Sequence, residues 1–348
     1  MDRHDIPTAV AIGFTISVLS TFGHEALGHG AACVLVRCVP IQVSSTYFLG
    51  DEAGLSSGAI RAISLGGTIF NLVLGLVFLA ALRIVGTRPE KGRVQTSVVP
   101  ARQYYVLWFG AMSNLVSASG YILFGSAFLF GDYATILEGT GLPVRIGCVA
   151  VGGALYLGSL WVAARLADPL LGSGKDRRGR LFALVLLPKV ATSAVLSGSA
   201  LLSPYPEAAF FSFIGHLFPA IGAWGMLQWF VGDGTGEPAQ PIARSRSWWV
   251  TSAVVAIVAA GVLGPGIPRS TRAELESLRG DLTDPSGVAR VASIRTALEC
   301  PDCPVNGGTS DPIGARMEAL REGVGRRRPG RAHHRVGVDV RRGSHPAR

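Results

Sequence analysis

Apolar residues fill seven long runs of the 348-residue chain, and short polar segments separate them. The runs cover residues 7–36, 60–84, 102–130, 142–166, 180–203, 208–231 and 248–266. An α-helix needs about 20 apolar residues to cross the hydrocarbon core of a bilayer, so each run is long enough to span a membrane. We therefore expect an all-α, polytopic membrane protein with about seven transmembrane helices in a domain over residues 1–266.

Residues 39–49 interrupt this pattern with β-branched and aromatic side chains, and the sequence GDEAG follows at residues 50–54. Such a composition, closed by turn residues, predicts a short strand or hairpin rather than a helix. Two interpretations of the hairpin stay open. It is an ordinary surface hairpin, or its edge adds an extended peptide segment to the sheet.

The chain changes character after the last run, because residues 267–348 are polar and rich in arginine. They carry too few apolar side chains to form a core, so this tail is expected to be largely disordered. The tail contains two cysteines, Cys300 and Cys303. They are unpaired, or they form a local disulfide, or they are half of a zinc knuckle, and the sequence leaves these three interpretations open. The other three cysteines lie in or beside the apolar runs and are interpreted as small buried apolar residues. They are Cys33, Cys38 and Cys148.

Hydrophobic residues make up 49% of the chain and charged residues 16%, with a formal net charge of +9. Basic residues gather in every second polar segment: Arg88, Lys91, Arg93, Lys175, Arg177, Arg178, Arg180, Arg244 and Arg246. By the positive-inside rule these segments are cytoplasmic, which places the amino terminus inside the cell and the carboxyl tail outside. We interpret the charge as a topology signal and expect no nucleic-acid partner. We expect a multi-pass integral protein of the cell (plasma) membrane, in contact with the lipid bilayer.

The sequence HEALGH, at residues 24–29, lies inside the first apolar run. Two imidazoles and a carboxylate are costly to place unpaired in hydrocarbon, so such a cluster is by default a functional site. Neutral imidazole is a good zinc ligand, and an unligated Glu beside it can take a proton from water at the metal. We expect His24 and His29 to bind Zn²⁺ and Glu25 to act as general base. A polar helix contact, a proton relay and a decayed active site are the alternatives.

The two His are five residues apart, one more than in the usual helical motif H-E-x-x-H. In an α-helix this spacing puts the side chains about 140° apart, whereas four residues put them about 40° apart. A single-turn π-bulge, with about 4.4 residues per turn, brings them back onto one face, and such bulges are found mostly at functional sites. Gly28 lowers the steric cost of the bulge. The first run, about 30 residues long, exceeds the need of a bilayer and should tilt, bend or break.

The sequence motif H-E-x-x-G-H resembles the zinc motif of the dipeptidyl peptidase III family, in which both His bind zinc and the Glu is the catalytic base. Over roughly residues 10–140 the chain also resembles the site-2 protease family of intramembrane zinc metalloproteases. The similar features are a His-Glu-His motif in the first run, a strand-like segment after it, and a glycine-to-asparagine element. That element runs from Gly67 to Asn71, like the family's G-P-x-x-N with Thr68 in place of Pro.

Asn114 and Asp132 follow, like that family's Asn and zinc-ligand Asp. The resemblance implies Asp132 as third zinc ligand and Asn114 as a hydrogen-bond donor to the transition state, with the His-Glu-His motif in the roles given above. Glu138, Glu207 and His216 compete as third ligand. The chain departs from the family in its His spacing and in lacking a Pro between Asn114 and Asp132. It also departs in orientation, because the charge rule puts the motif in the outer half of the membrane, whereas the family's zinc lies toward the cytosol.

Two further polar residues, Lys189 and His216, lie within apolar runs. Lys189 must find a carboxylate, a carbonyl or a water-filled cavity there, and His216 is interpreted as a hydrogen-bonded core histidine. The expected function is a membrane-embedded zinc endopeptidase that hydrolyses peptide bonds of transmembrane or membrane-adjacent protein substrates. The alternatives are a transporter or channel, in which the cluster forms an ion or proton path with Lys189 and His216, and an inactive pseudo-protease.

Overall fold

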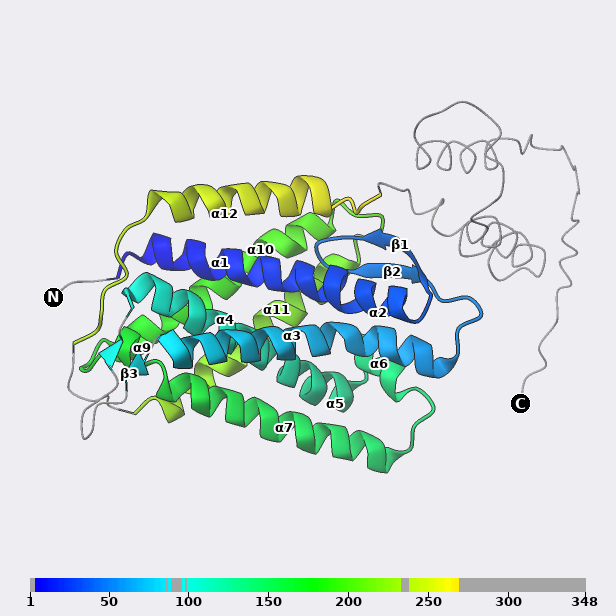
Figure 1. Cartoon of the computed structure of the whole chain (residues 1–348), viewed down its shortest axis with the longest axis horizontal. Coiled ribbons are helices and arrows are strands. Elements are labelled where there is room, and N and C mark those ends of the chain that lie inside the picture. Colours follow the sequence, from blue (N-terminus) through cyan, green and yellow to red (C-terminus); the bar gives the residue numbers. More distant parts are fainter. Residues whose placement is uncertain (1–3, 86, 89–95, 98, 233–237, 269–348) are drawn as a thin grey trace, which may run out of the picture. The chain divides into compact units, whose positions relative to one another are not determined.

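The computed structural model describes residues 4–85, 87–88, 96–97, 99–232 and 238–268 (Figure 1). Within this part of the chain, seven helices are long and apolar enough to cross a membrane. They are Ile6–Leu35, Ser57–Ile84, Ala101–Phe128, Leu142–Arg165, Arg177–Ala200, Ala208–Phe230 and Arg246–Leu263. The prediction of seven such helices is confirmed, and it indicates a membrane protein. The predictions for the arginine-rich tail, including those for Cys300 and Cys303, fall on residues outside the described part.

Several of these long helices are interrupted by a π turn, written η below. In chain order the helical elements are α1 (Ile6–Gly23), η1 (His24–His29), α2 (Gly30–Leu35), α3 (Ser57–Val85), α4 (Ala101–Gly120), η2 (Tyr121–Gly125), α5 (Ser126–Phe128), α6 (Asp132–Leu137), α7 (Leu142–Arg165), α8 (Asp168–Leu171), α9 (Arg177–Leu181), η3 (Phe182–Leu186), α10 (Leu187–Ala200), α11 (Ala208–Phe230), α12 (Arg246–Val258) and η4 (Ala259–Leu263). The strands are β1 (Val39–Val43), β2 (Phe48–Asp51), β3 (Thr87–Arg88) and β4 (Thr96–Ser97). A π turn accommodates one extra residue, so the flanking α-helical segments can keep their buried faces.

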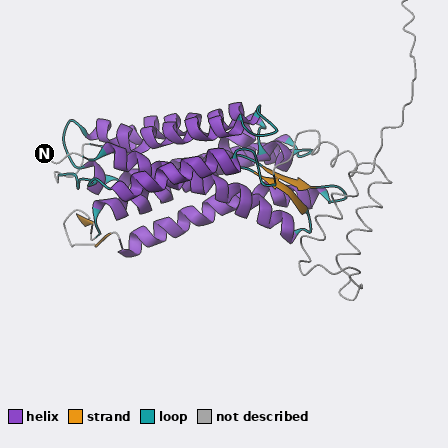
Figure 2. Ribbon diagram, turned by 90° about the horizontal axis from the view of Figure 1, so that it is seen from above, coloured by secondary structure: helices purple, strands orange, loops and turns teal. Residues whose placement is uncertain are grey.

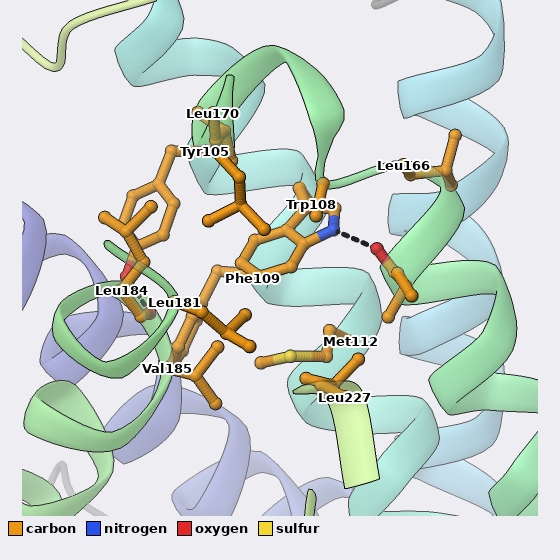
Figure 3. Packing of buried hydrophobic residues seen from close by; sticks show 14 of the residues in the cluster. Tyr105, Trp108, Phe109, Met112, Leu166, Leu170, Leu181, Leu184, Val185 and Leu227 are labelled. Atoms are coloured by element: carbon orange, nitrogen blue, oxygen red, sulfur yellow. Dashed lines mark hydrogen bonds between the residues drawn. The ribbon is translucent and has the colours of Figure 1, made fainter. Parts of the chain in front are cut away.

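Helix α4 is central among the described helices, because it contacts α1, α3, α7 and α11. Its side chains Tyr104, Tyr105, Trp108 and Phe109 are almost completely buried in the main apolar cluster (Figure 3). Three of them donate hydrogen bonds to carbonyls of neighbouring segments: Tyr104 Oη to Leu166 O at 2.8 Å, Tyr105 Oη to Leu184 O at 2.7 Å, and Trp108 Nε1 to Ala163 O at 2.9 Å. Because these polar groups are satisfied inside an apolar cluster, they hold α4 in one position against α7 and η3.

Strands β1 and β2 form the antiparallel hairpin predicted after the first helix, and Figure 2 shows it at one end of the helices. The register pairs Val43 with Phe48 and shifts between Pro40 and Gln42. On the other side of β1, the Ile267 N–H donates to Val43 O at 2.8 Å, and Ile267 O accepts from the Val43 N–H at 3.0 Å. Ile267, which the sequence analysis assigned to the tail, therefore covers β1 at this position. The edge that has no strand partner in the described part of the chain belongs to β2.

Cys33 and Cys38 form a disulfide across the turn from α2 to β1. Both are buried, as expected, but the interpretation that they are merely small apolar residues is wrong, because they are paired. Arg37 takes a positive φ of 65°, and the Cys38 N–H donates to Cys33 O at 2.8 Å, so the chain folds back over the helix end and brings the thiols together. Gly50 of β2 lies against the bridge, where a Cβ would come within 2.6 Å of Cys38 Sγ. The disulfide therefore fixes the hairpin to the helix that carries the HEALGH motif, while Cys148 is a free thiol.

Candidate metal centre

The HEALGH motif forms η1, the π turn predicted from the spacing of its two His. The Gly30 N–H donates to the Glu25 carbonyl, a bond to the fifth residue before it, as in a π turn. At about 82° per residue, the step from His24 to His29 places the imidazoles about 49° apart around the helix instead of about 140°. Their ring centroids lie 4.8 Å apart with an interplanar angle of 81°. The predicted bulge is confirmed, and it turns both imidazoles to one side.

Glycines allow η1 and α3 to pack closely behind the motif. A Cβ on Gly28 would lie 2.6 Å from the Gly67 Cα, and a Cβ on Gly66 would lie 2.3 Å from Gly28 O. A Cβ on Gly67 would lie 2.3 Å from His24 Nε2. These distances are too short for real contacts, so the backbones approach only because the side chains are absent. Gly28 is thus required by the contact with α3, and Gly67 leaves the space that the His24 imidazole occupies.

Asp132 is the first residue of α6, and the chain reverses direction just before it. Leu129 and Gly131 take positive φ values of 52° and 56°, which end the third long helix and start the short one. This turn brings the Asp132 carboxylate back to η1. Its Oδ2 lies 3.7 Å from His24 Nε2 and 3.4 Å from His29 Nε2. The structure therefore brings together the three ligands that the sequence analysis proposed.

The three ligand atoms all lie within 4.8 Å of one another. A tetrahedral zinc ion with bonds of about 2.0–2.1 Å separates its ligands by about 3.4 Å, and both carboxylate distances are close to this value. Burial by itself raises the pKa of the Asp132 carboxyl, but the two neighbouring imidazoles hold that pKa below its ordinary value and favour the ionised carboxylate. Among the described residues, the competing candidates Glu138, Glu207 and His216 are not part of the group.

Two groups behind the imidazoles fix their orientation. His29 Nδ1 donates to the Ile63 carbonyl at 2.8 Å, which leaves Nε2 facing Asp132. His24 Nδ1 lies 3.0 Å from the carboxamide nitrogen of Asn71, whose Oδ1 has no partner among the described residues. Turning that carboxamide by 180° lets Oδ1 accept from the His24 Nδ1–H and frees Nε2 for a metal. In the sequence, Asn71 was visible only as the end of the glycine-to-asparagine element and had no assigned role, and the Ile63 carbonyl has no sequence signal.

Glu25 lies beside the three ligands without belonging to them. The backbone N–H of Phe48, in β2, is a hydrogen-bond partner of its carboxyl group. Asn114 is almost fully buried in α4, and its carboxamide nitrogen donates to Ser20 Oγ at 3.0 Å and to Gly110 O at 2.9 Å. Both amide hydrogens of Asn114 are therefore in use, and its Oδ1 is the atom without a partner in the described structure. A role for Asn114 as donor to a substrate requires one of these two bonds to open.

The comparisons with known proteins found no match. No family model matches the sequence, and neither a curated protein nor a solved structure matches it. What the site itself supports is a group of two imidazoles and one carboxylate that could hold a metal ion.

A cavity of about 610 Å³ reaches His24 and Glu25 and extends between α1, α4, α10 and α11. Its wall includes Lys189 and His216. The His216 Nε2 lies 3.0 Å from Thr21 Oγ1, and its Nδ1 donates to the Ser212 carbonyl at 2.7 Å. The interpretation of His216 as a hydrogen-bonded histidine of the bundle is confirmed, and both of its nitrogens are in use.

Proposed function

We propose that the protein is a membrane-embedded zinc endopeptidase that cuts transmembrane or membrane-adjacent polypeptides. The observation that carries this proposal is the π turn η1, which directs His24 and His29 at Asp132 and leaves Glu25 next to them. Three protein ligands with a carboxylate beside them are typical of catalytic zinc sites, because the fourth position stays open. The resemblance to site-2 proteases points to the same activity and ligands.

The donor set of two imidazole nitrogens and one carboxylate oxygen suits zinc among the common metal ions. When bound, zinc would supply Lewis acidity that polarises a substrate carbonyl and favours ionisation of water. Glu25 acts as general base and accepts the proton of the attacking water. The Phe48 N–H holds the Glu25 carboxylate in position, and the Ile63 carbonyl and Asn71 hold the imidazoles.

The hairpin offers a way to present an extended substrate. Because both backbone groups of Val43 bond to Ile267, the facing pair of Val43 and Phe48 is not hydrogen-bonded, and the backbone groups of Phe48 point away from β1. The Phe48 N–H and C=O groups therefore lie on the edge of β2 that faces away from β1, where the N–H is a hydrogen-bond partner of the Glu25 carboxyl group. A substrate segment that adds to this edge would pass the general base, in the manner of β-augmentation.

We place the metal centre on the outer side of the membrane. The positive-inside rule puts this end of the bundle outside, and the Cys33–Cys38 disulfide lies at the same end. Disulfides persist in oxidising compartments and are rare in the cytosol. The site would then act on segments that face the cell exterior, unlike the cytosolic-side zinc of the site-2 proteases.

The test uses the full chain in liposomes together with synthetic single-span peptides, and mass spectrometry detects new peptide termini. The wild type should cut a subset of the peptides, and 1,10-phenanthroline should stop it. Glu25→Gln should abolish cutting while zinc stays bound, and Glu138→Gln, the same change at an exposed side chain outside the group, should not affect it. Cleavage by Glu25→Gln would refute the role of Glu25. A zinc-loaded wild type that cuts nothing would favour the pseudo-protease.

A second candidate, an ion or proton path, is favoured by one observation. Lys189 and His216 line the same cavity that reaches His24, and ionisable residues inside membranes often mark such paths. This function predicts proton or cation flux into dye-loaded liposomes that depends on His24 and His29. Flux with no bound zinc would support it against the protease.

A further inference from the structure

Lys189 is a cation inside the bundle that has no ionic partner among the residues the structure describes. It lies on α10 and lines the cavity that reaches the metal centre. Its Nζ lies 2.5 Å from Ser113 Oγ and 5.8 Å from the centre of the Phe109 ring. Among the described residues it forms no ion pair with any carboxylate. The sequence analysis expected Lys189 to find a carboxylate, a carbonyl or a water-filled cavity. Of these three, the structure provides the cavity.

A hydroxyl and a ring face are weak substitutes for a counter-ion. The ring attracts the ammonium electrostatically, but neither group is an anion. Charged residues inside membranes usually pair or mark the path of a substrate. A molecule that enters the cavity can supply the missing charge.

The wall of the same cavity carries further polar groups whose hydrogen-bonding capacity is unused. The hydroxyls of Ser17 on α1 and Ser212 on α11 are buried, line the cavity and have no hydrogen-bond partner in the described structure. Buried polar groups without partners usually mark bound water or a ligand. A hydroxyl can donate to an anion, so these groups complement the ammonium. Glu25, on the wall of the same cavity, repels an anion and so favours its binding at Lys189.

The position of the amine relates it to the metal ligands. Lys189 contacts Ser113, and the next residue of α4, Asn114, donates to Ser20 Oγ. Ser20 precedes His24 by one helical turn on the same long helix. Lys189 and His24 line one cavity, and a single bound peptide segment can therefore meet both the amine and the metal centre.

We propose that Lys189 is the anion-binding residue of this cavity, and that the substrate is an apolar peptide segment with a carboxylate near the bond that is cut. The cleavage part rests on the proposed function, whereas the binding part does not. The carboxylate belongs to an acidic side chain or to the end of a peptide chain, and both present the same group to the amine.

The test measures binding alone, so it is independent of peptide hydrolysis. The full chain in a non-ionic detergent is incubated with tritiated N-dodecanoylglycine in a scintillation proximity assay. Three unlabelled competitors are compared: N-dodecanoylglycine, with a terminal carboxylate; N-dodecanoylaspartic acid α-amide, with a side-chain carboxylate; and N-dodecanoylglycinamide, without charge. The wild type should prefer at least one acid over the uncharged amide by about tenfold or more, and the better acid identifies the source of the carboxylate.

Lys189→Met should abolish the preference, and Lys189→Arg should keep it. Lys175→Met, the same change at an exposed loop residue, should leave it intact. His29→Ala, which removes a metal ligand, should also keep the preference, because the amine and not the metal holds the anion. The proposal is wrong if no saturable binding occurs, if Lys189→Met still prefers the acid, or if the preference disappears in His29→Ala. Zinc content and gel-filtration profile of Lys189→Met, both expected to equal those of the wild type, show that the variant is folded.

Discussion

Deleting Leu27 should convert the π turn into an α turn without separating the two His. Leu27 is 63% exposed and contributes neither a ligand nor a core contact. The deletion gives the sequence H-E-A-G-H, in which the His are four residues apart and Glu25 still follows the first one. In an α-helix they then lie about 40° apart, compared with about 49° in the π turn. At the side-chain radius of about 5–6 Å, this difference moves an imidazole by about 1 Å.

Zinc affinity decides the outcome of this prediction, and it is measured by competition with a chromophoric chelator in detergent. The deletion variant should bind one zinc per chain with an affinity within about 100-fold of the wild type, because a shift of this size resembles a change behind the ligands, which costs about 10–100-fold. Its thermal stability should not fall, since α-helical hydrogen bonds replace those of the π turn.

The matched control inserts one Ala after Leu27. The His are then six residues apart, which places them about 120–130° apart in either helix type and separates the imidazoles by about 9 Å. No single metal ion can bind both, so zinc affinity should fall by more than about 100-fold, beyond the effect of changes behind the ligands. A folded deletion variant without zinc, or an insertion variant that keeps it, would refute the argument that helical register creates the site.

Two further substitutions test the surroundings of His24. Gly67→Ala places a Cβ 2.3 Å from His24 Nε2 and should lower zinc affinity at least about tenfold; Gly158→Ala, where a Cβ meets nothing within 4 Å, should leave zinc unchanged and stabilise its helix slightly, as thermal unfolding would show. Equal zinc affinity of the two variants would contradict the close contact. Asn71→Leu removes the partner of His24 Nδ1 and should cost about 10–100-fold in zinc affinity, whereas Asn71→Asp, with an oxygen in the same place, should restore it. Loss in both variants to the same degree would indicate a packing role.

The helices and the π turn were predictable because they follow from short-range rules. Seven apolar runs of sufficient length define the long helices. A five-residue step between two ligands on one helix leaves a π turn as the simple way to bring them to one face. The hairpin followed from its β-branched composition and turn residues, although the pairing of Ile267 with β1 joins segments too distant in sequence to predict.

The remaining parts of the site depend on tertiary structure. The Cys33–Cys38 disulfide needs the positive φ of Arg37, which no residue type in that turn demands. Asp132 was proposed through the family resemblance, and its place beside η1 depends on the reversal at residues 129–131. The proposal of an anion site at Lys189 became possible only when packing showed that no carboxylate of the described chain forms an ion pair with it.

The most direct test of the central claim is the zinc content of the detergent-purified full chain, measured by elemental mass spectrometry. We predict about one zinc per chain in the wild type, loss of that zinc in His29→Ala, and retention in His216→Ala, which removes a histidine whose nitrogens bond elsewhere. A wild type without zinc, or a His29→Ala variant that keeps it, would contradict a metal centre on η1.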